Sequence, residues 1–205
     1  MGRAFRSTLP NPPDDFLGLV IGPVGSGKTY LMKKVAALYD CLILDLIGEW
    51  EGFGANVYDP SVLPSVVKRG GSVVFHPPNL DPIWFPWALQ VAAARRKEVG
   101  PTVFVCDEIA RFAETFGPTD YVAEILARRR HYRLGLLLGT QRPAFLPSLL
   151  PGQWSHLVTF RFMDPRDRDW MKRMNYRTWE AAETLGKHEY VLTVPTGEIS
   201  KGKDF

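Results

Sequence analysis

Cysteine and histidine are scarce in this chain, which has 2 of the first and 4 of the second among its 205 residues. Cys41 and Cys106 each lie in or beside an apolar run, and no group of Cys and His has the spacing of a metal site. A Cys/His metal centre is therefore excluded. We expect two buried free thiols, the state that a reducing compartment maintains.

Long apolar runs and a large net charge are also lacking. No run is long enough to cross a bilayer. Residues 1–15 are polar and proline-rich without the apolar centre of a signal peptide, and position 6 lacks the Ser or Thr of a myristoylation signal. We therefore expect a soluble protein with no membrane span. Lys and Arg total 25 against 22 acids, and the net charge of +3 is too small to indicate a nucleic-acid partner without local clustering.

The pattern of apolar runs predicts an α/β fold. The length, with 45% hydrophobic residues, suits one domain with its own core. Prolines exclude an α-helix from residues 1–15, so we expect an extended arm there and a single domain over 16–205. Alternating strands and helices predict a mainly parallel central sheet with helices on both faces. The predicted strands are 16–21, 41–46, 72–75, 102–106, 134–138, 156–162 and 189–194, and the predicted helices are 28–38, 83–97, 121–132, 165–174 and 178–185.

A phosphate-binding loop follows the first predicted strand and opens the first predicted helix. The pattern G-x-x-x-x-G-K-[ST] occurs once there, and that strand–helix context favours it over a glycine-rich turn with an exposed lysine. Glycines let backbone N–H groups face phosphate oxygens, and the helix adds a positive end. Lys28 is expected to reach the β- and γ-phosphates, and the Thr29 hydroxyl to bind Mg²⁺. The predicted nucleotide-binding residues are Gly22, Pro23, Val24, Gly25, Ser26, Gly27, Lys28 and Thr29.

An acidic pair, Asp107 and Glu108, ends the fourth predicted strand. An Asp at this place can hold Mg²⁺, here through water, as a Walker B acid does. A second acid beside it can act as the general base for water, which favours hydrolysis over phosphoryl transfer to a small molecule. Two solvated acids that cap a helix are the alternative.

A polar pair, Thr140 and Gln141, follows the fifth predicted strand. Gln141 is a candidate to sense the γ-phosphate or to orient water, although a turn before Pro143 explains the pair by itself equally simply. Because ligands bind beyond the carboxyl ends of parallel strands, the phosphate loop, the acidic pair and this pair are expected to form one site.

The densest basic stretch is Arg128–Arg133. An arginine inserted from a neighbouring subunit contributes about 10³–10⁵-fold to the rate in other P-loop hydrolases. Cations at the end of a helix are the alternative explanation.

Taken together, these motifs resemble the FtsK–HerA superfamily of ring-forming, DNA-translocating ATPases. The likeness runs from about residue 16 to residue 199. It rests on five stretches: Gly22–Thr29, Leu44–Trp50 (like D-x-x-G-E-[YF]), Val103–Glu108, Arg130–Pro143 (like R-x-x-G-x-x-L running into T-Q-R-P), and Arg161–Asp167 with Gly186–Tyr190.

The resemblance implies a RecA-like P-loop fold, ATP and Mg²⁺ as cofactors, and a homohexameric ring with nucleotide sites between subunits. It also implies that Arg130, ten residues before Thr140, is the finger that reaches the neighbouring site, with Arg129 and Arg133 as rivals. Glu108, Lys28, Gln141 and Arg130 are then the catalytic residues, and Thr29 and Asp107 the magnesium ligands.

Because the chain is short, it looks most like the packaging ATPases of tailless viruses with an internal membrane. We therefore expect an ATPase that drives double-stranded DNA into a preformed capsid, with capsid or vertex proteins as partners, in the host cytoplasm or the virion. A filamentous-phage assembly ATPase of the zonula occludens toxin type and a plasmid-transfer or HerA-type translocase are alternatives. A small-molecule P-loop kinase and a non-catalytic scaffold leave more residues unexplained.

Two further groups are candidates for contacts. Basic residues at 68–69 and 95–97 are possible DNA contacts, although a solvated surface explains each one as well. The aromatic cluster of Trp84, Phe85 and Trp87 is expected to pack in the core or in a subunit interface.

Overall fold

The computed structural model describes residues 9–10, 13–99, 102–115, 121–146, 150 and 152–203. The strands are β1 (Leu17–Ile21), β2 (Cys41–Leu44), β3 (Ala55–Val57), β4 (Val73–Phe75), β5 (Thr102–Cys106), β6 (Leu134–Thr140), β7 (His156–Phe160), β8 (Glu189–Thr193) and β9 (Ile199–Lys203). The α-helices are α2 (Lys28–Ala36), α3 (Leu63–Val67), α4 (Trp84–Val99), α5 (Tyr121–Ala127), α6 (Pro165–Met174) and α7 (Tyr176–Glu183). Short 3-10 helices are η1 (Pro13–Asp15), η2 (Pro60–Val62), η3 (Ile109–Thr115) and η4 (Pro143–Phe145).

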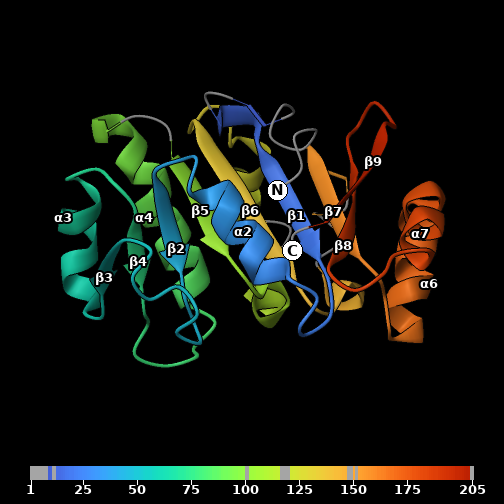
Figure 1. The fold of residues 1–205 in the computed structure, drawn as a ribbon. Helices are drawn as coiled ribbons and strands as arrows, with labels where there is room; N and C mark the ends of the chain where they lie inside the picture. The colour runs from blue at the N-terminus through green and yellow to red at the C-terminus, as the bar shows by residue number, and fades with distance from the viewer. Residues whose placement is uncertain are drawn as a thin grey trace.

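The strands form a single nine-stranded sheet in the order β3-β4-β2-β5-β6-β1-β7-β8-β9 (Figure 1). Pairing is parallel from β3 to β7 and antiparallel from β7 through β9. The mainly parallel sheet predicted from the sequence is therefore confirmed. The central strands β1, β5 and β6 are buried along their whole length, as expected of parallel strands covered on both faces.

Two apolar cores lie on the two faces of the sheet. Helix α2 covers one face, where Leu31, Met32 and Val35 pack with side chains of β1, β2 and β5. Helices α4 and α5 belong to the other core. The aromatic cluster of α4 packs around Phe75 and Phe104, as one of the two expected placements had it, and Val122 of α5 is buried.

Some elements differ from the prediction. Helix α5 ends at Ala127, and Arg128–Arg133 form turns instead of the helix predicted to reach residue 132. The Arg129 guanidinium donates to the Leu126 carbonyl at 3.1 Å, which satisfies a carbonyl at the end of the helix. The sequence reading also missed β3, α3 and β9, which are short or largely polar.

The β8–β9 hairpin completes one side of the sheet. A turn that includes residues 195–197 joins the two strands, and Gly197 adopts a φ of 83° that a glycine accepts without strain.

The arm predicted for residues 1–15 falls mostly outside the described residues. Within the described part, η1 lies against β6, and the carbonyl of Pro13 accepts a hydrogen bond of 2.9 Å from the Phe16 N–H. A Cβ on Gly135 of β6 would lie 2.8 Å from the Pro13 oxygen, so glycine permits this close approach. Among the described residues, no helix combines the length and apolar character needed to span a membrane.

Candidate functional site

The three polar clusters predicted from the sequence meet at the carboxyl ends of β1, β5 and β6. These strands are neighbours in the sheet, with Ile21 opposite Thr140 and Cys106 opposite Leu138. Together they border a pocket of about 250 Å³. Its walls come from the phosphate loop, from the segment after β2, and from Asp107, Glu108, Arg111 and Gln141. The structure therefore brings the three predicted clusters together, whereas the roles of their residues stay predictions.

The phosphate loop has the backbone shape that its glycines predict. Gly25 and Gly27 have φ angles of 73° and 102°, where residues with a Cβ are strained. The carbonyl of Gly27 accepts the Leu31 N–H at 2.9 Å, which starts α2 directly after the loop. A Cβ on Gly22 would lie 2.5 Å from the Ser26 hydroxyl oxygen. This backbone shape suits an anion site, in which backbone N–H groups face the phosphate oxygens.

Lys28, Thr29 and Asp107 form the floor of the pocket. The Lys28 ammonium and the Thr29 hydroxyl each donate a short hydrogen bond to one oxygen of the Asp107 carboxylate. Burial raises the pKa of the Asp107 carboxyl above its ordinary value, although the Lys28 ammonium acts in the opposite direction. Lys28 is itself only 6% exposed, so the pair is largely removed from water. Desolvated charges of this kind bind a further charged ligand strongly because water screens them poorly.

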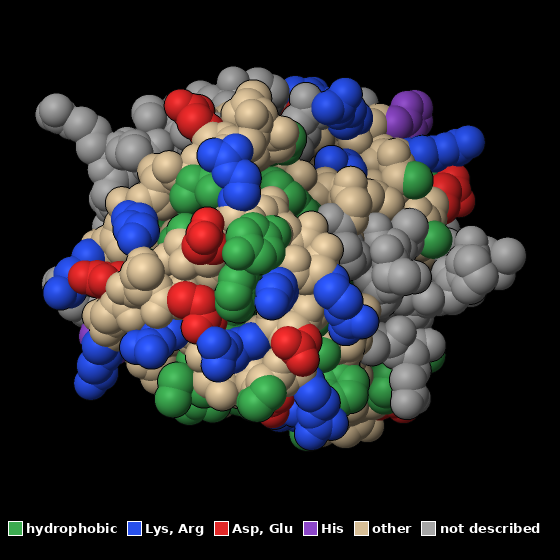
Figure 2. Space-filling view, turned by 90° about the vertical axis from the view of Figure 1, so that its right-hand side faces the viewer, with side chains coloured by type: hydrophobic (Ala, Val, Ile, Leu, Met, Phe, Trp, Pro, Cys, Tyr) green, Lys and Arg blue, Asp and Glu red, His purple; other side chains and the backbone are tan. Residues whose placement is uncertain are grey.

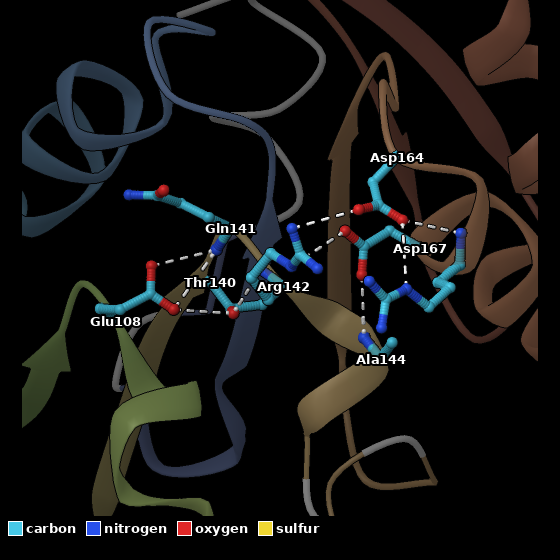
Figure 3. A network of polar contacts seen from close by, with 8 residues as sticks. Glu108, Thr140, Gln141, Arg142, Ala144, Asp164 and Asp167 are labelled. Atoms are coloured by element: carbon cyan, nitrogen blue, oxygen red, sulfur yellow. Dashed lines mark hydrogen bonds and ion pairs between the residues drawn. The ribbon is translucent and has the colours of Figure 1, made fainter.

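Glu108 is fixed by the strand end that carries the Thr140–Gln141 pair. The Thr140 hydroxyl donates to Glu108 Oε1 at 3.0 Å, and the Gln141 N–H donates to Oε2 at 3.1 Å. Burial raises the pKa of Glu108, and these two hydrogen bonds lower it. Figure 3 shows the Glu108 carboxylate facing both donors, while the Gln141 side chain points away from Arg142. A carboxylate held in this way beside the phosphate loop suits a general base.

The loop after β2 supplies residues that the sequence analysis did not assign to the site. The buried Asp45 carboxylate accepts N–H bonds of 2.8–3.3 Å from all four residues 47–50 and so shapes the loop. Glu49 then reaches the Thr29 hydroxyl at 2.9 Å, and the Lys33 ammonium donates a short bond to the Glu49 carbonyl. The D-x-x-G-E pattern was the available signal for this arrangement.

The oxygen ligands of the pocket fit Mg²⁺. Among the described residues, no group of three or more His, Cys, Asp or Glu side chains lies close enough to hold a metal ion alone. Thr29 and Asp107 nevertheless place a hydroxyl and a carboxylate side by side, and Mg²⁺ typically takes one or two such protein ligands with phosphate oxygens and water. The predicted ligands thus fit an ion that binds together with a nucleotide.

A second pocket, of about 350 Å³, lies on the other side of the phosphate loop. Pro23, Val24 and Gly25 line both pockets. Phe160, Met163 and Leu185 supply apolar walls to the second one, and the His188 ring nitrogen lies 3.2 Å from the Ser26 carbonyl oxygen. Apolar walls with a few polar groups suit a flat heterocycle.

The arginines of the basic stretch lie away from the pocket. They precede β6 at its amino end, whereas the pocket lies at the carboxyl end of the sheet. Arg129 binds the carbonyl of Gln153 at 3.2 Å and Arg133 pairs with Asp14 at 3.3 Å, while Arg130 is exposed. Besides Lys28, the pocket is lined by Arg111, which was not singled out from the sequence.

The structure changes the list of possible DNA contacts. Arg95 is only 2% exposed, and its guanidinium donates to the Gly71 carbonyl at 2.7 Å, so its selection as a surface contact was wrong. Lys68 and Arg69 are exposed, and the side chains of residues 96 and 97 lie outside the described part. Figure 2 looks at the α6 and α7 side of the molecule, where Lys and Arg side chains are interspersed with acids instead of forming one basic patch.

Comparisons with known proteins agree with this fold. No protein-family model matches the chain. A genome-packaging NTPase, B204 of Sulfolobus turreted icosahedral virus 2, solved with sulfate, is 26% identical at a TM-score of 0.81 over 94% of this chain and 98% of its own. The DNA-packaging ATPase B204 of Sulfolobus turreted icosahedral virus is 24% identical at a TM-score of 0.81 over 95% and 99%. The cytoplasmic domain of the Thermomonospora curvata type VII secretion ATPase EccC is 16% identical at 0.57 over 91% and 25%.

These neighbours share the arrangement of strands and helices over nearly the whole chain. The predicted P-loop ATPase fold is therefore confirmed, and so is the resemblance to viral packaging ATPases that the motifs indicate.

Proposed function

We propose that this chain is an ATPase that moves double-stranded DNA, and that it packages a viral genome into a preformed capsid. The observation that carries the proposal is the single pocket that unites the phosphate loop, the acidic pair and Gln141. Support comes from packaging NTPases that match this chain over almost their full length. The virion or the host cytoplasm is the corresponding location, with capsid or vertex proteins as partners.

ATP would bind across the two pockets. Its phosphates would take the place beside Gly25–Thr29, where Lys28 would turn from Asp107 toward the β- and γ-phosphates. The base would lie against the apolar walls of the second pocket, because the loop residues that separate the two pockets line both. Mg²⁺, when bound, supplies positive charge to the β- and γ-phosphate oxygens, and Thr29 and Asp107 would hold it.

Glu108 would accept the proton of the attacking water as the water oxygen bonds to the γ-phosphorus. The bond from that phosphorus to the β–γ bridging oxygen breaks, which leaves ADP and phosphate. The raised pKa of Glu108 makes its carboxylate a stronger base than an exposed glutamate. Gln141, at the end of β6, would sense whether the γ-phosphate is present.

Arg130 would act on the site of the next subunit in a homohexameric ring. Its distance from the pocket of its own subunit supports a role in trans, since it lies at the opposite end of the sheet. DNA in the ring channel would be held through its phosphates, a sequence-independent and salt-sensitive contact.

The experiment that tests the proposal is the rate of ATP hydrolysis with and without double-stranded DNA, on protein sized by light scattering. We expect hydrolysis that DNA stimulates, no turnover in Lys28→Ala, and ATP binding without cleavage in Glu108→Gln. Lys172→Ala on the surface of α6 is the matched lysine control and should behave as wild type. Near-normal turnover by Lys28→Ala would exclude the site, and phosphoryl transfer to a small molecule instead of water would make the protein a kinase.

A conjugation or repair translocase is the second candidate. It would use the same chemistry, and this fold also occurs in the Thermomonospora curvata secretion ATPase. The share of each neighbour's own chain that matches favours packaging, because it is 98–99% for the packaging NTPases but 25% for the secretion ATPase. Capture of a capsid protein by the Glu108→Gln variant, locked with ATP, would separate the two.

A further inference from the structure

Arg142 connects the catalytic strand end to a distant helix. Its backbone N–H donates to the Thr140 hydroxyl oxygen at 3.0 Å. Its guanidinium extends the other way, with Nη1 at 3.2 Å from Asp164 and Nε at 3.6 Å from Asp167. Figure 3 shows the whole line of contacts, from Glu108 through Thr140 to Arg142 and on to the two aspartates.

The direction of the hydrogen bonds makes the backbone of Arg142 important for Glu108. A hydroxyl has one proton to donate. Because the Thr140 oxygen accepts the Arg142 N–H, its own proton is free to point at Glu108 Oε1, which lies at 3.0 Å. A hydroxyl that accepts one bond while donating another is also a stronger donor. The position of Arg142 therefore sets both the direction and the strength of this contact.

The aspartates that hold Arg142 are themselves well fixed. Asp164 caps α6 by accepting the Arg166 N–H at 2.8 Å. Asp167 is 3% exposed and accepts the Ala144 N–H at 3.2 Å. The start of α6 thus contacts the segment just after Gln141 in two ways. The two aspartates form ion pairs with the Arg142 guanidinium, and Asp167 also accepts the backbone N–H of Ala144. The Arg142 side chain is partly exposed, but the Asp167 carboxylate is buried, so removing Arg142 leaves that buried carboxylate without its counter-charge.

We propose that Arg142 is a positioning residue for the hydrolysis proposed above: clamped by Asp164 and Asp167, it holds the end of β6 so that Thr140 and Gln141 aim the Glu108 carboxylate at the attacking water. The inference rests on the proposed ATPase function. It assigns to α6 the task of supporting the catalytic strand end, although no residue of α6 lines the pocket.

The test is a set of variants assayed for kcat, for KM and for binding of a fluorescent ADP analogue. Arg142→Ala should lower kcat by about ten- to one-hundred-fold, the effect of a small misplacement of a catalytic group, while KM and ADP binding stay within about twofold. Arg142→Lys keeps the charge without the fork of donors and should fall in between. Asp167→Asn keeps the acceptor for Ala144 and should lower kcat as well.

The control is Arg168→Ala, which breaks the ion pair between α6 and Glu183 of α7 but does not touch the strand end. It should stay within about twofold of wild type, which distinguishes positioning from general support of α6. The Arg142→Ala, Asp167→Asn double variant should lose no more than the worse single variant, since both remove the same clamp.

Wild-type kcat in Arg142→Ala, an equal loss in Arg168→Ala, or additive losses in the double variant would each overturn the inference. If Arg142→Ala fails to fold by circular dichroism, the Arg142→Lys and Asp164→Asn variants decide in its place. Absence of ATP hydrolysis by the wild type itself would instead count against the proposed function.

Discussion

Gly139 lies in β6 directly behind the acidic pair, and we expect Gly139→Ala to damage the site more than the fold. A Cβ at this position would lie 2.6 Å from Asp107 Oδ1 and 2.7 Å from Met32 Sδ, both closer than real carbon contacts. The thioether of Met32 can move aside cheaply. The Asp107 carboxylate cannot, because Lys28 and Thr29 hold it.

The size of the effect follows from two opposing contributions. Overpacking a core costs about 1–3 kcal/mol, while replacing a strand glycine by alanine returns about 0.4–1 kcal/mol through the unfolded state. The net destabilisation is then at most about 2.5 kcal/mol, which for a chain of this length lowers the melting temperature by up to about 10 °C. The displaced Asp107 should meanwhile lower kcat by about tenfold or more.

Thermal unfolding followed by circular dichroism and ATP hydrolysis at 25 °C measure the two effects separately. Gly152→Ala is the control, since a Cβ there meets no atom within 4 Å and should change neither quantity. A Gly139→Ala protein with wild-type turnover would refute the assignment of Asp107 to the magnesium site.

Two other features give independent predictions. Asp45→Ala leaves four backbone N–H groups without their acceptor and should destabilise the protein by about 2 kcal/mol or more in thermal unfolding. Asp59→Ala, which removes one exposed cap, should destabilise the protein clearly less, and equal losses would contradict the role given to Asp45. Burial raises the pKa of Cys41 to about 12 and that of Cys106 well above its ordinary value, so neither thiol should react with a disulfide reagent until the protein unfolds. Rapid labelling of the native protein at pH 8 would show that the sheet opens locally.

Much of the fold was predictable because each central strand carries its own signal. Continuous apolar runs mark β1, β5 and β6, and the rule that ligands bind at the carboxyl ends of parallel strands brings their polar neighbours together. Weakly buried elements gave no such signal. In β3, for example, only Val57 is buried, so this three-residue strand shows no alternation of apolar and polar residues that would predict it.

The contacts that shape the site were harder to predict. Asp45 bonds to backbone N–H groups, and because residues of almost any type have such a group, only the motif pointed to these contacts. The partners of Arg142 lie on α6, far along the chain, and any of several acids there would have seemed equally suitable. Arg95 illustrates the opposite error: a basic run suggested a surface, but only packing reveals that its first arginine is buried.

The β9 strand affects how copies of this chain can meet. It forms one margin of the sheet, where unpaired backbone groups can recruit a strand from another molecule. Lys201 and Lys203 stand exposed on this margin, and like charges would face each other if two copies paired there. Exposed lysines on an edge strand disfavour strand pairing between molecules, so this margin of the sheet resists open-ended fibre growth.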